Sequence, residues 1–432
     1  MRNANPRRLD IEALIDDRRN RIIVCCGSGG VGKTTAAAAI GLRAAERGRH
    51  VVVLTVDPAR RLAQSMGLTS LDNTPRPVPF AARGHGSRGQ QEKGHNGDVG
   101  GGSMHAMMLD MKRTFDEIVE AHADPDRAAQ ILANPFYQSL SSSFAGTQEY
   151  MAMEKLGQLR RADEWDLIVV DTPPSRSALD FLDAPQRLGR FLDGKLLRLL
   201  TAPAKLGGRA YLKVLNAGFG VVTGVLTKVL GGQVLKDVQT FVSALDTMFG
   251  GFRERADYTY QLLRAPGTAF LVIAAPEPDA LREASYFVER LAQEGMPLAG
   301  LMLNRVHRSP AGRLSAARSL AAAETLQGID ERAGAVARSR PASGDPSAGD
   351  SATAGRARER PPTHSLAISA LRLHAGRMQL AATERRVTEH FTSAHPLVPI
   401  TEVPAQPDDV HDLAGLRIIG QSFRADQGQA AG

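Results

Sequence analysis

The loop that decides the fold reads Gly27-Ser28-Gly29-Gly30-Val31-Gly32-Lys33-Thr34-Thr35. The apolar run 22–26 precedes it and predicts a buried strand, and the alanine-rich segment 35–46 follows it and predicts a helix. A G-x-x-x-x-G-K-T loop between a strand and a helix is typical of a phosphate-binding P-loop. The alternative is a glycine-rich turn that happens to precede a lysine, and the flanking elements argue against it.

Each residue type in this loop suits a nucleotide phosphate. Glycines let backbone N–H groups approach the phosphate because no Cβ blocks the way, and the positive end of the following helix favours an anion. We expect Lys33 to neutralise the β- and γ-phosphates and Thr34 to offer its hydroxyl to Mg²⁺. The sequence therefore predicts an ATP and Mg²⁺ site to which all of residues 27–35 contribute.

The composition is that of an ordinary globular protein, with 432 residues of which 43% are hydrophobic. This length allows one large α/β domain with insertions, which we predict to span residues 1–432, or two smaller domains. Cys25 and Cys26 are adjacent in the first predicted strand. Two adjacent cysteines cannot build a disulfide framework or a four-ligand metal site, so we predict that they are core residues.

The formal net charge of +7 is of the sign that nucleic-acid-binding proteins carry. Much of the excess lies in residues 332–360, a segment that looks unfolded, so we expect no nucleic acid partner. Asp10 and Glu12 stand where a secretion signal needs an apolar core. We therefore expect a cytoplasmic protein, or one peripheral to a membrane.

Strands and helices alternate along the rest of the chain. Further apolar runs predict strands at 50–56, 104–109, 166–171, 268–275, 298–303 and 397–401. Helical spacing predicts helices at 9–17, 62–66, 110–132, 147–161, 280–293, 365–391 and 410–422. This alternation is typical of an α/β fold with a doubly wound, mostly parallel sheet, in which ligands bind at the carboxyl ends of the strands.

A second candidate site residue, Asp171, ends one of these strands and is followed by Thr172-Pro173-Pro174. An aspartate in that position can hold a Mg²⁺-bound water beside a P-loop. The alternative is an aspartate that caps the next helix. The presence of the P-loop favours the metal-binding interpretation, with Thr34 and Asp171 as the metal ligands.

Several segments do not fit the strand–helix alternation. Residues 81–103 and 333–362 lack apolar periodicity, and we predict two disordered insertions there. Residues 111–161 and 187–252 are predicted to form a helical insertion subdomain. The second part holds little charge, which raises the possibility of a membrane span, but its glycines, threonines and amides favour an amphipathic insertion.

These motifs together resemble the deviant Walker A ATPases. The P-loop, Asp57-Pro58-Ala59 after the second strand and Asp171-Thr172-Pro173-Pro174 are most similar to the ArsA/GET branch, and within it to actinobacterial anion-transporting ATPase-like proteins. Residues 145–149 also resemble that branch's Pro-Gly-x-Asp-Glu segment, with Glu149 kept. The resemblance covers most of the chain outside the two low-complexity insertions.

The resemblance implies a role for each matching position. Asp57 falls where a carboxylate orients the attacking water, so Asp57, Lys33 and Asp171 are the expected catalytic residues. Asn304 falls where an asparagine contacts adenine, and Val403 and Pro404 resemble the loop that covers the base. The two helical segments fall where relatives carry helices that bind a hydrophobic or membrane-protein client.

The chain departs from the family pattern in three ways. Ser28 stands where the full deviant motif has a lysine that reaches the partner's nucleotide across a dimer. Arg60-Arg61 replace the His-Ser of the first switch, and the family's metal-binding cysteines are absent. We therefore expect a heterodimer with a lysine-bearing paralogue, or a homodimer in which Arg60 or Arg61 substitutes for the lysine.

The sequence favours an ATP-hydrolysing dimeric switch that couples nucleotide state to client binding. Two alternatives stay open. The first is a ParA/MinD-type positioning ATPase, although residues 421–426 lack a basic amphipathic membrane helix. The second is the energising subunit of an anion pump, against which the missing thiols argue for soft metalloids.

Overall fold

The computed structural model describes residues 7–56, 60–80, 101–135, 137–138, 147–173, 254–339 and 364–423, with side chains left out at 60–62, 147–150 and 336–339. Asp57 and residues 187–252 lie outside these ranges, as do the family-like residues 145–146 and 174. Within the described ranges, no helix has both the length and the hydrophobicity needed to cross a bilayer.

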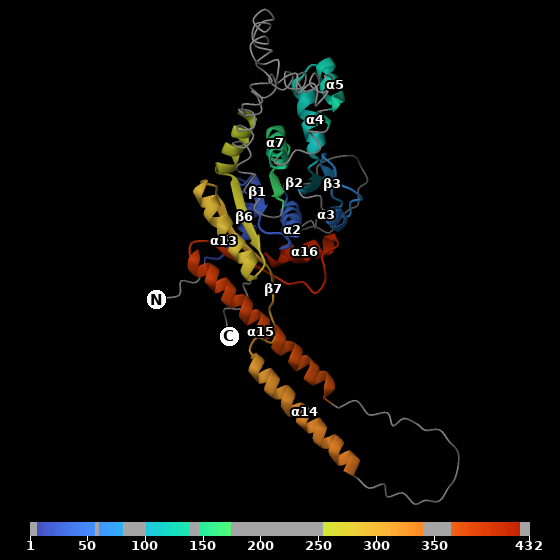
Figure 1. Cartoon of the computed structure of the whole chain (residues 1–432), viewed down its shortest axis with the longest axis vertical. Helices are drawn as coiled ribbons and strands as arrows, with labels where there is room; N and C mark the ends of the chain where they lie inside the picture. The colour runs from blue at the N-terminus through green and yellow to red at the C-terminus, as the bar shows by residue number, and fades with distance from the viewer. Residues whose placement is uncertain are drawn as a thin grey trace, which may run out of the picture.

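A single sheet forms the centre of the described part of the chain (Figure 1). Its strands are β1 (Ile22–Cys26), β2 (His50–Thr55), β3 (Arg76–Pro77), β4 (Ser103–Met108), β5 (Leu167–Asp171), β6 (Thr268–Ala274), β7 (Leu298–Val306) and β8 (Ile400–Pro404). Their order across the sheet is β3-β4-β2-β5-β1-β6-β7-β8. Among these strands every pairing is parallel except that of β3 with β4. The prediction of a doubly wound, mostly parallel sheet is confirmed.

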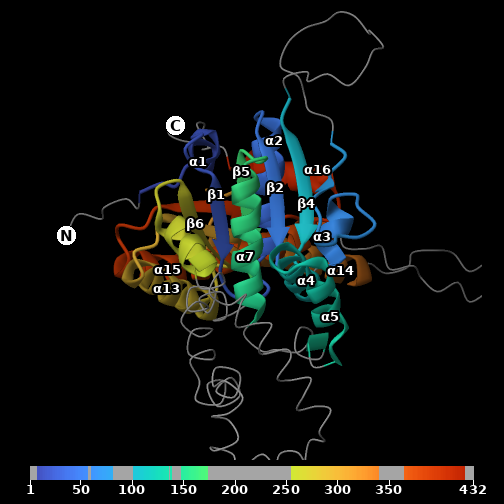
Figure 2. The same cartoon turned by 90° about the horizontal axis from the view of Figure 1, so that it is seen from above.

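Helices cover both faces of this sheet (Figure 2). They are α1 (Ile11–Asp16), α2 (Lys33–Glu46), α3 (Arg60–Ser65), α4 (Met111–His122), α5 (Pro125–Ala133), α7 (Thr147–Ala162), α13 (Pro278–Gln293), α14 (Ala316–Ser339), α15 (Ser365–Ala394) and α16 (Leu413–Ser422). Residues 254–264 are also helical. Helices α2 and α16 pack together on one face, and α7 and α13 lie on the other. The central strands are therefore buried on both sides, which explains why their sequences are continuous apolar runs.

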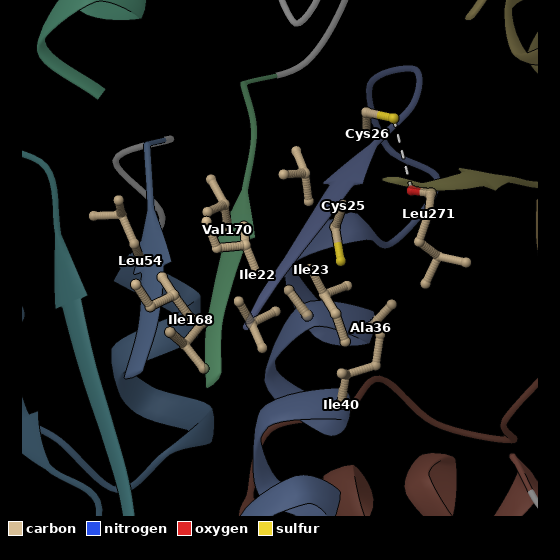
Figure 3. Close-up of a cluster of buried hydrophobic side chains, with 14 of the residues drawn as sticks. Ile22, Ile23, Cys25, Cys26, Ala36, Ile40, Leu54, Ile168, Val170 and Leu271 are labelled. Atoms are coloured by element: carbon tan, nitrogen blue, oxygen red, sulfur yellow. Dashed lines mark hydrogen bonds between the residues drawn. The ribbon is translucent and has the colours of Figure 1, made fainter. Parts of the chain in front are cut away.

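The centre of the core lies between β1 and α2 (Figure 3). Ile23 and Cys25 of β1 face Ala36 and Ile40 of α2, and all four are almost fully buried. Cys26 points to the other face of the sheet, where its thiol contacts the Leu271 carbonyl at 3.7 Å. Burial raises the pKa of the Cys26 thiol to about 12 and also raises that of Cys25. Both cysteines are core residues, as predicted.

Helices α14 and α15 form a hairpin that extends away from the sheet (Figure 1). It connects the neighbouring parallel strands β7 and β8. The sequence predicted α15 but not α14, and residues 333–339 were wrongly assigned to a disordered insertion. They continue α14 because this stretch alternates alanine, the best helix former, with other residues and contains no proline.

Three other predicted boundaries were wrong. Residues 110–132 form two helices, because Pro125 starts α5 and the side chains of Asp110 and Asp124 cap the two helix starts. Ser103, placed in the insertion 81–103, is the first residue of β4 and its backbone N–H donates to the Arg49 carbonyl. The last strand runs through Pro404, because it stays paired with β7 to that point: Val306 registers with Pro404, and its carbonyl accepts the Ala405 N–H.

Candidate functional site

The glycine-rich loop links the end of β1 to the start of α2, as the sequence predicts. Gly27 has φ +149°, and a Cβ there would lie 2.0 Å from the Ile273 carbonyl oxygen of β6. Gly32 has φ +90°, and its Cβ would lie 2.3 Å from Asn304 Nδ2. Both positions therefore require glycine, through a left-handed backbone conformation and through lack of space.

Lys33 is the first residue of α2 and its side chain is buried against the loop. Its Nζ donates a hydrogen bond to the Ser28 carbonyl oxygen at 2.7 Å. The ammonium group thus lies over the loop, close to the backbone N–H groups that follow Ser28. This is the arrangement that brings a cation next to an anion held by the loop.

A fully buried carboxylate, Asp171, lies beside the loop. Thr34 Oγ1 donates to Asp171 Oδ2 at 2.7 Å, and Thr55 Oγ1 donates to the same oxygen at 2.9 Å. Thr172, the next residue, hydrogen-bonds the Cys25 carbonyl at 2.9 Å and fixes the end of β5 against β1. The sheet register explains this meeting, because Asp171 pairs with Cys25 on one side and with Thr55 on the other.

The donor set at this point fits magnesium. A hydroxyl and a carboxylate are hard oxygen ligands, which Mg²⁺ prefers, usually with several waters and phosphate oxygens completing its coordination. The Cys25 residue pairs with Asp171 in the sheet, but its thiol is buried in the core against α2. We therefore expect hard cations at this position.

Asn304 joins the loop from the other side of β1. It lies on β7, two strands away from β1, and its Nδ2 donates to the Val31 carbonyl at 2.8 Å. The side chain is buried. Arg305, the next residue, has φ +62°, a left-handed conformation that is uncommon outside glycine, and the pairing of β7 with β8 is irregular there, between Leu303 and Val306. The loop and the end of β7 are thus one connected structure.

A cavity of about 650 Å³ opens beside these groups. Its size is that of a typical site for a small molecule or cofactor. The wall is built from the start of α2, from α3, from the end of β7 and from the segment that follows β8. The lining residues are Gly32, Thr34, Thr35, Gln64, Ser65, Asn304, Arg305, His307, residues 404–411 and Ile419.

The structure brings several predicted site residues to this cavity and leaves others away from it. Gly32, Thr34, Thr35, Asn304 and Pro404 line the cavity. Residues 27–31, Lys33, Asp171 and Val403 do not, and Val403 is buried in β8. Asp57 lies outside the described residues, and so do the side chains of Arg60 and Arg61.

Sequence reasoning missed Thr55, Gln64, Ser65, Arg305, His307 and residues 405–411. Thr55 had a signal, since it is a hydroxyl at the carboxyl end of a strand, two residues before Asp57. His307 also had a signal, since it is a polar side chain shortly after the predicted strand 298–303 and three residues after Asn304. The signal for the segment 405–411 was its position directly after Val403 and Pro404, which resemble the loop that covers the base.

Comparisons with known proteins agree with the sequence motifs and with the fold. A model of the anion-transporting ATPase family, ArsA ATPase, matches residues 20–332. The chain belongs to this family. It is therefore an ATPase, as the motifs predicted. The family match ends within α14, so α15, β8 and the cavity wall at 404–411 lie beyond it.

Individual relatives are distant from this ATPase. It is 22% identical over 304 residues to ATPase GET3 of Malassezia globosa, an alignment that covers 70% of this chain and 77% of the fungal protein. It is also 22% identical over 300 residues to ATPase get3 of Schizosaccharomyces pombe, covering 69% and 78%. A shorter match, 29% identical over 177 residues, is to Protein Rv2184c of Mycobacterium tuberculosis and covers 40% and 39%.

Proposed function

We propose that this ATPase binds Mg·ATP with the triphosphate on residues 27–35 and the base at the Asn304 end of the cavity. The observation that carries the proposal is the contact of Thr34 with Asp171 directly beside the loop. Thr34 and Asp171 would hold the metal, Asp171 through a water molecule. When bound, Mg²⁺ neutralises charge on the β- and γ-phosphates.

Lys33 supplies the second positive group of the proposed site. In the structure its ammonium is held by the Ser28 carbonyl. A phosphate group is a stronger acceptor because it is charged, so we expect Lys33 to exchange the carbonyl for phosphate oxygens when ATP binds. The exchange requires a rotation of one side chain and leaves the backbone of the loop in place.

Asn304 gives the site a preference for adenine. One hydrogen of its Nδ2 is donated to the Val31 carbonyl, and we propose that the amide oxygen, the only acceptor of the side-chain amide, faces the base. An amide oxygen accepts a hydrogen bond from the 6-amino group of adenine and not from the 6-oxo group of guanine. Calorimetry with Mg²⁺ should show ATP binding at least about tenfold more tightly than GTP, and Asn304→Ala should reduce that ratio. Equal affinities for ATP and GTP in the wild-type chain would contradict this orientation.

Asp57 is the proposed water-orienting carboxylate. The proposal rests on its place in the sequence, two residues after the end of β2. The end of β2 lies next to β5, and Thr55 contacts Asp171 there. A carboxylate that follows this strand is close enough in the chain to reach the same end of the sheet.

We further propose a dimeric switch in which ATP state controls capture of a hydrophobic or membrane-associated client by residues 111–161 and 187–252. The low charge and helical length of the second segment support it, since exposed apolar surfaces of that size usually mark binding sites. Deleting residues 187–252 should leave ATP affinity unchanged and abolish nucleotide-dependent capture of an apolar helical peptide. If the deleted protein still captures the peptide, this part of the proposal is wrong.

A further inference from the structure

His307 is a cavity-lining residue that the proposed function does not use. It directly follows Val306, the last residue of β7, in the loop that links β7 to α14. Its side chain is 35% exposed. Because it lies three residues beyond Asn304, it is at most about 10 Å further from the phosphate-binding loop along an extended chain.

Two contacts with one carboxylate hold His307 in place. Its backbone N–H donates to Glu384 Oε2 at 2.8 Å, and its ring Nδ1 lies 2.5 Å from Glu384 Oε1. Glu384 belongs to α15, and its side chain is only 8% exposed. A carboxylate this deeply buried is stable only when its oxygens are hydrogen-bonded or paired with a cation. Both oxygens of Glu384 are used on this one residue.

The pairing fixes which part of the histidine is available. With Nδ1 directed at Glu384, the atoms left for a bound molecule are Nε2 and the face of the ring. A carboxylate that binds one imidazole nitrogen sets both the tautomer and the orientation of the ring. Without the carboxylate, a surface histidine would sample several side-chain rotamers.

We propose that His307 contacts the nucleobase in the cavity and that Glu384 is its positioning residue. This inference rests on the proposed nucleotide site. The phosphate-binding groups, Gly32, Thr34 and Thr35, line one part of the cavity, and Asn304 lies beside them. His307 lies past Asn304 along the chain, so it belongs to the part of the cavity that the base and ribose occupy.

A matched control is His374, which also lies on α15 and contacts the same loop. It lies ten residues before Glu384, about 15 Å away along the helix. Its Nε2 donates to the Leu314 carbonyl at 2.8 Å, and its Nδ1 lies 3.0 Å from Ser309 Oγ. His374 thus holds the far end of the loop as Glu384 holds the near end. None of Ser309, Leu314 and His374 lines the cavity.

The test compares ATP with inorganic tripolyphosphate, which lacks the base and the sugar. Calorimetry in the presence of Mg²⁺ measures the affinity of the full-length chain for both ligands. We expect His307→Ala and Glu384→Ala each to weaken ATP binding about tenfold, the range for loss of one aromatic contact with a base, and to leave tripolyphosphate within twofold. Glu384→Gln keeps an acceptor oxygen and should restore part of the loss, while His374→Ala should change neither affinity.

Three results would overturn the inference. The first is that His307→Ala binds ATP as tightly as the wild-type chain. The second is that Glu384→Ala or Glu384→Gln weakens the affinity for ATP and for tripolyphosphate equally, and the third is that His374→Ala weakens ATP binding as much as Glu384→Ala. Glu384→Gln is the variant to use if Glu384→Ala does not fold. Lys33→Ala separates this inference from the proposed function, because it should weaken both ligands. If Lys33→Ala changes neither, the nucleotide site itself is wrong.

Discussion

Thr34 Oγ1 lies 2.7 Å from Asp171 Oδ2, although the two residues are 137 positions apart in the sequence. The parallel pairing of β1 with β5 produces this contact, because it places both strand ends at the same edge of the sheet. One residue comes from the loop after β1 and the other ends β5. The contact therefore brings the phosphate-binding loop and the proposed metal-binding carboxylate into a single hydrogen-bonded unit.

Replacing Asp171 by asparagine should depress Mg²⁺-dependent ATP hydrolysis by about 100-fold, because the neutral amide no longer stabilises the metal's charge. Thr172→Val is the control. It removes the neighbouring hydrogen bond to Cys25 and leaves Asp171 intact, so its hydrolysis rate should stay within threefold of wild type. Steady-state rates over a Mg²⁺ titration measure both. An Asp171→Asn rate equal to that of Thr172→Val would exclude a metal-binding role.

Asp57→Asn should separate binding from turnover. A carboxylate that orients the attacking water acts mainly in the transition state, so hydrolysis should fall roughly 100-fold while the affinity for ATP stays within about twofold. Calorimetry gives the affinity and phosphate release gives the rate. Parallel losses of affinity and rate would instead indicate that Asp57 maintains the structure of the loop.

Gly32→Ala should destabilise the loop for two separable reasons. The left-handed backbone at φ +90° costs about 1–3 kcal/mol for a residue with a Cβ, and the new methyl group meets Asn304 Nδ2. In an Asn304→Ala background the steric part disappears and the backbone part remains. In urea unfolding, the double variant should therefore be destabilised by about 1 kcal/mol less than the sum of the two single variants. Additive effects would show that the Asn304 side chain moves aside at no cost.

Ser28→Lys tests whether the missing cation limits turnover. If a lysine crosses a dimer interface in this family-like assembly, the purified wild-type chain should hydrolyse ATP slowly and Ser28→Lys should raise the rate at least about tenfold. Ser28 is buried, at 9% exposure, so thermal melting must first show that the variant is folded. A fast homodimeric wild-type ATPase that Ser28→Lys leaves unchanged would exclude the requirement.

The buried thiols predict a loss of stability at alkaline pH. Burial raises the pKa of Cys26 from 9.0 to about 12 and also raises that of Cys25, so the native state stays protonated where the unfolded state ionises. The stabilisation is complete below about pH 9 and is lost towards pH 12, with a slope of about 1.4 kcal/mol per pH unit for each thiol. Urea unfolding between pH 8 and pH 10 should show a shallower decline for Cys25→Ala/Cys26→Ala than for wild type. Identical slopes in the two proteins would contradict the pKa shifts.

The sequence predicted the centre of this molecule well because local chemistry determines it. The loop at 27–35 needs glycines, a lysine and a flanking strand and helix, and all of these are contiguous. The strands β1, β2 and β5 are continuous apolar runs because helices cover both faces of the sheet. The polar residues that end two of these runs, Thr55 of β2 and Asp171 of β5, are therefore easy to locate in the sequence.

The parts that sequence reasoning missed depend on long-range packing or on weak patterns. Helix α14 has no strong apolar stripe, and its alanines resemble low-complexity sequence. Only the fold shows that it packs along α15. The cavity wall at 405–411, beyond the predicted Pro404, becomes part of the site because β8 pairs with β7. Glu384 is one acidic residue on a long helix, and only the folded chain shows that it is buried beneath His307.

The hydrogen bond from Asn304 to the Val31 carbonyl means that the two ends of a nucleotide would not be sensed independently. A base that engages the Asn304 amide also steadies the peptide unit after Val31, whose neighbour Gly32 leads into the phosphate-binding helix. Adenosine and pyrophosphate, added as separate fragments, would then bind cooperatively. Each fragment would order the loop in part and so reduce the conformational-entropy cost of binding the other. The binding of the base and the binding of the phosphates would therefore be coupled, and their free energies would not be independent.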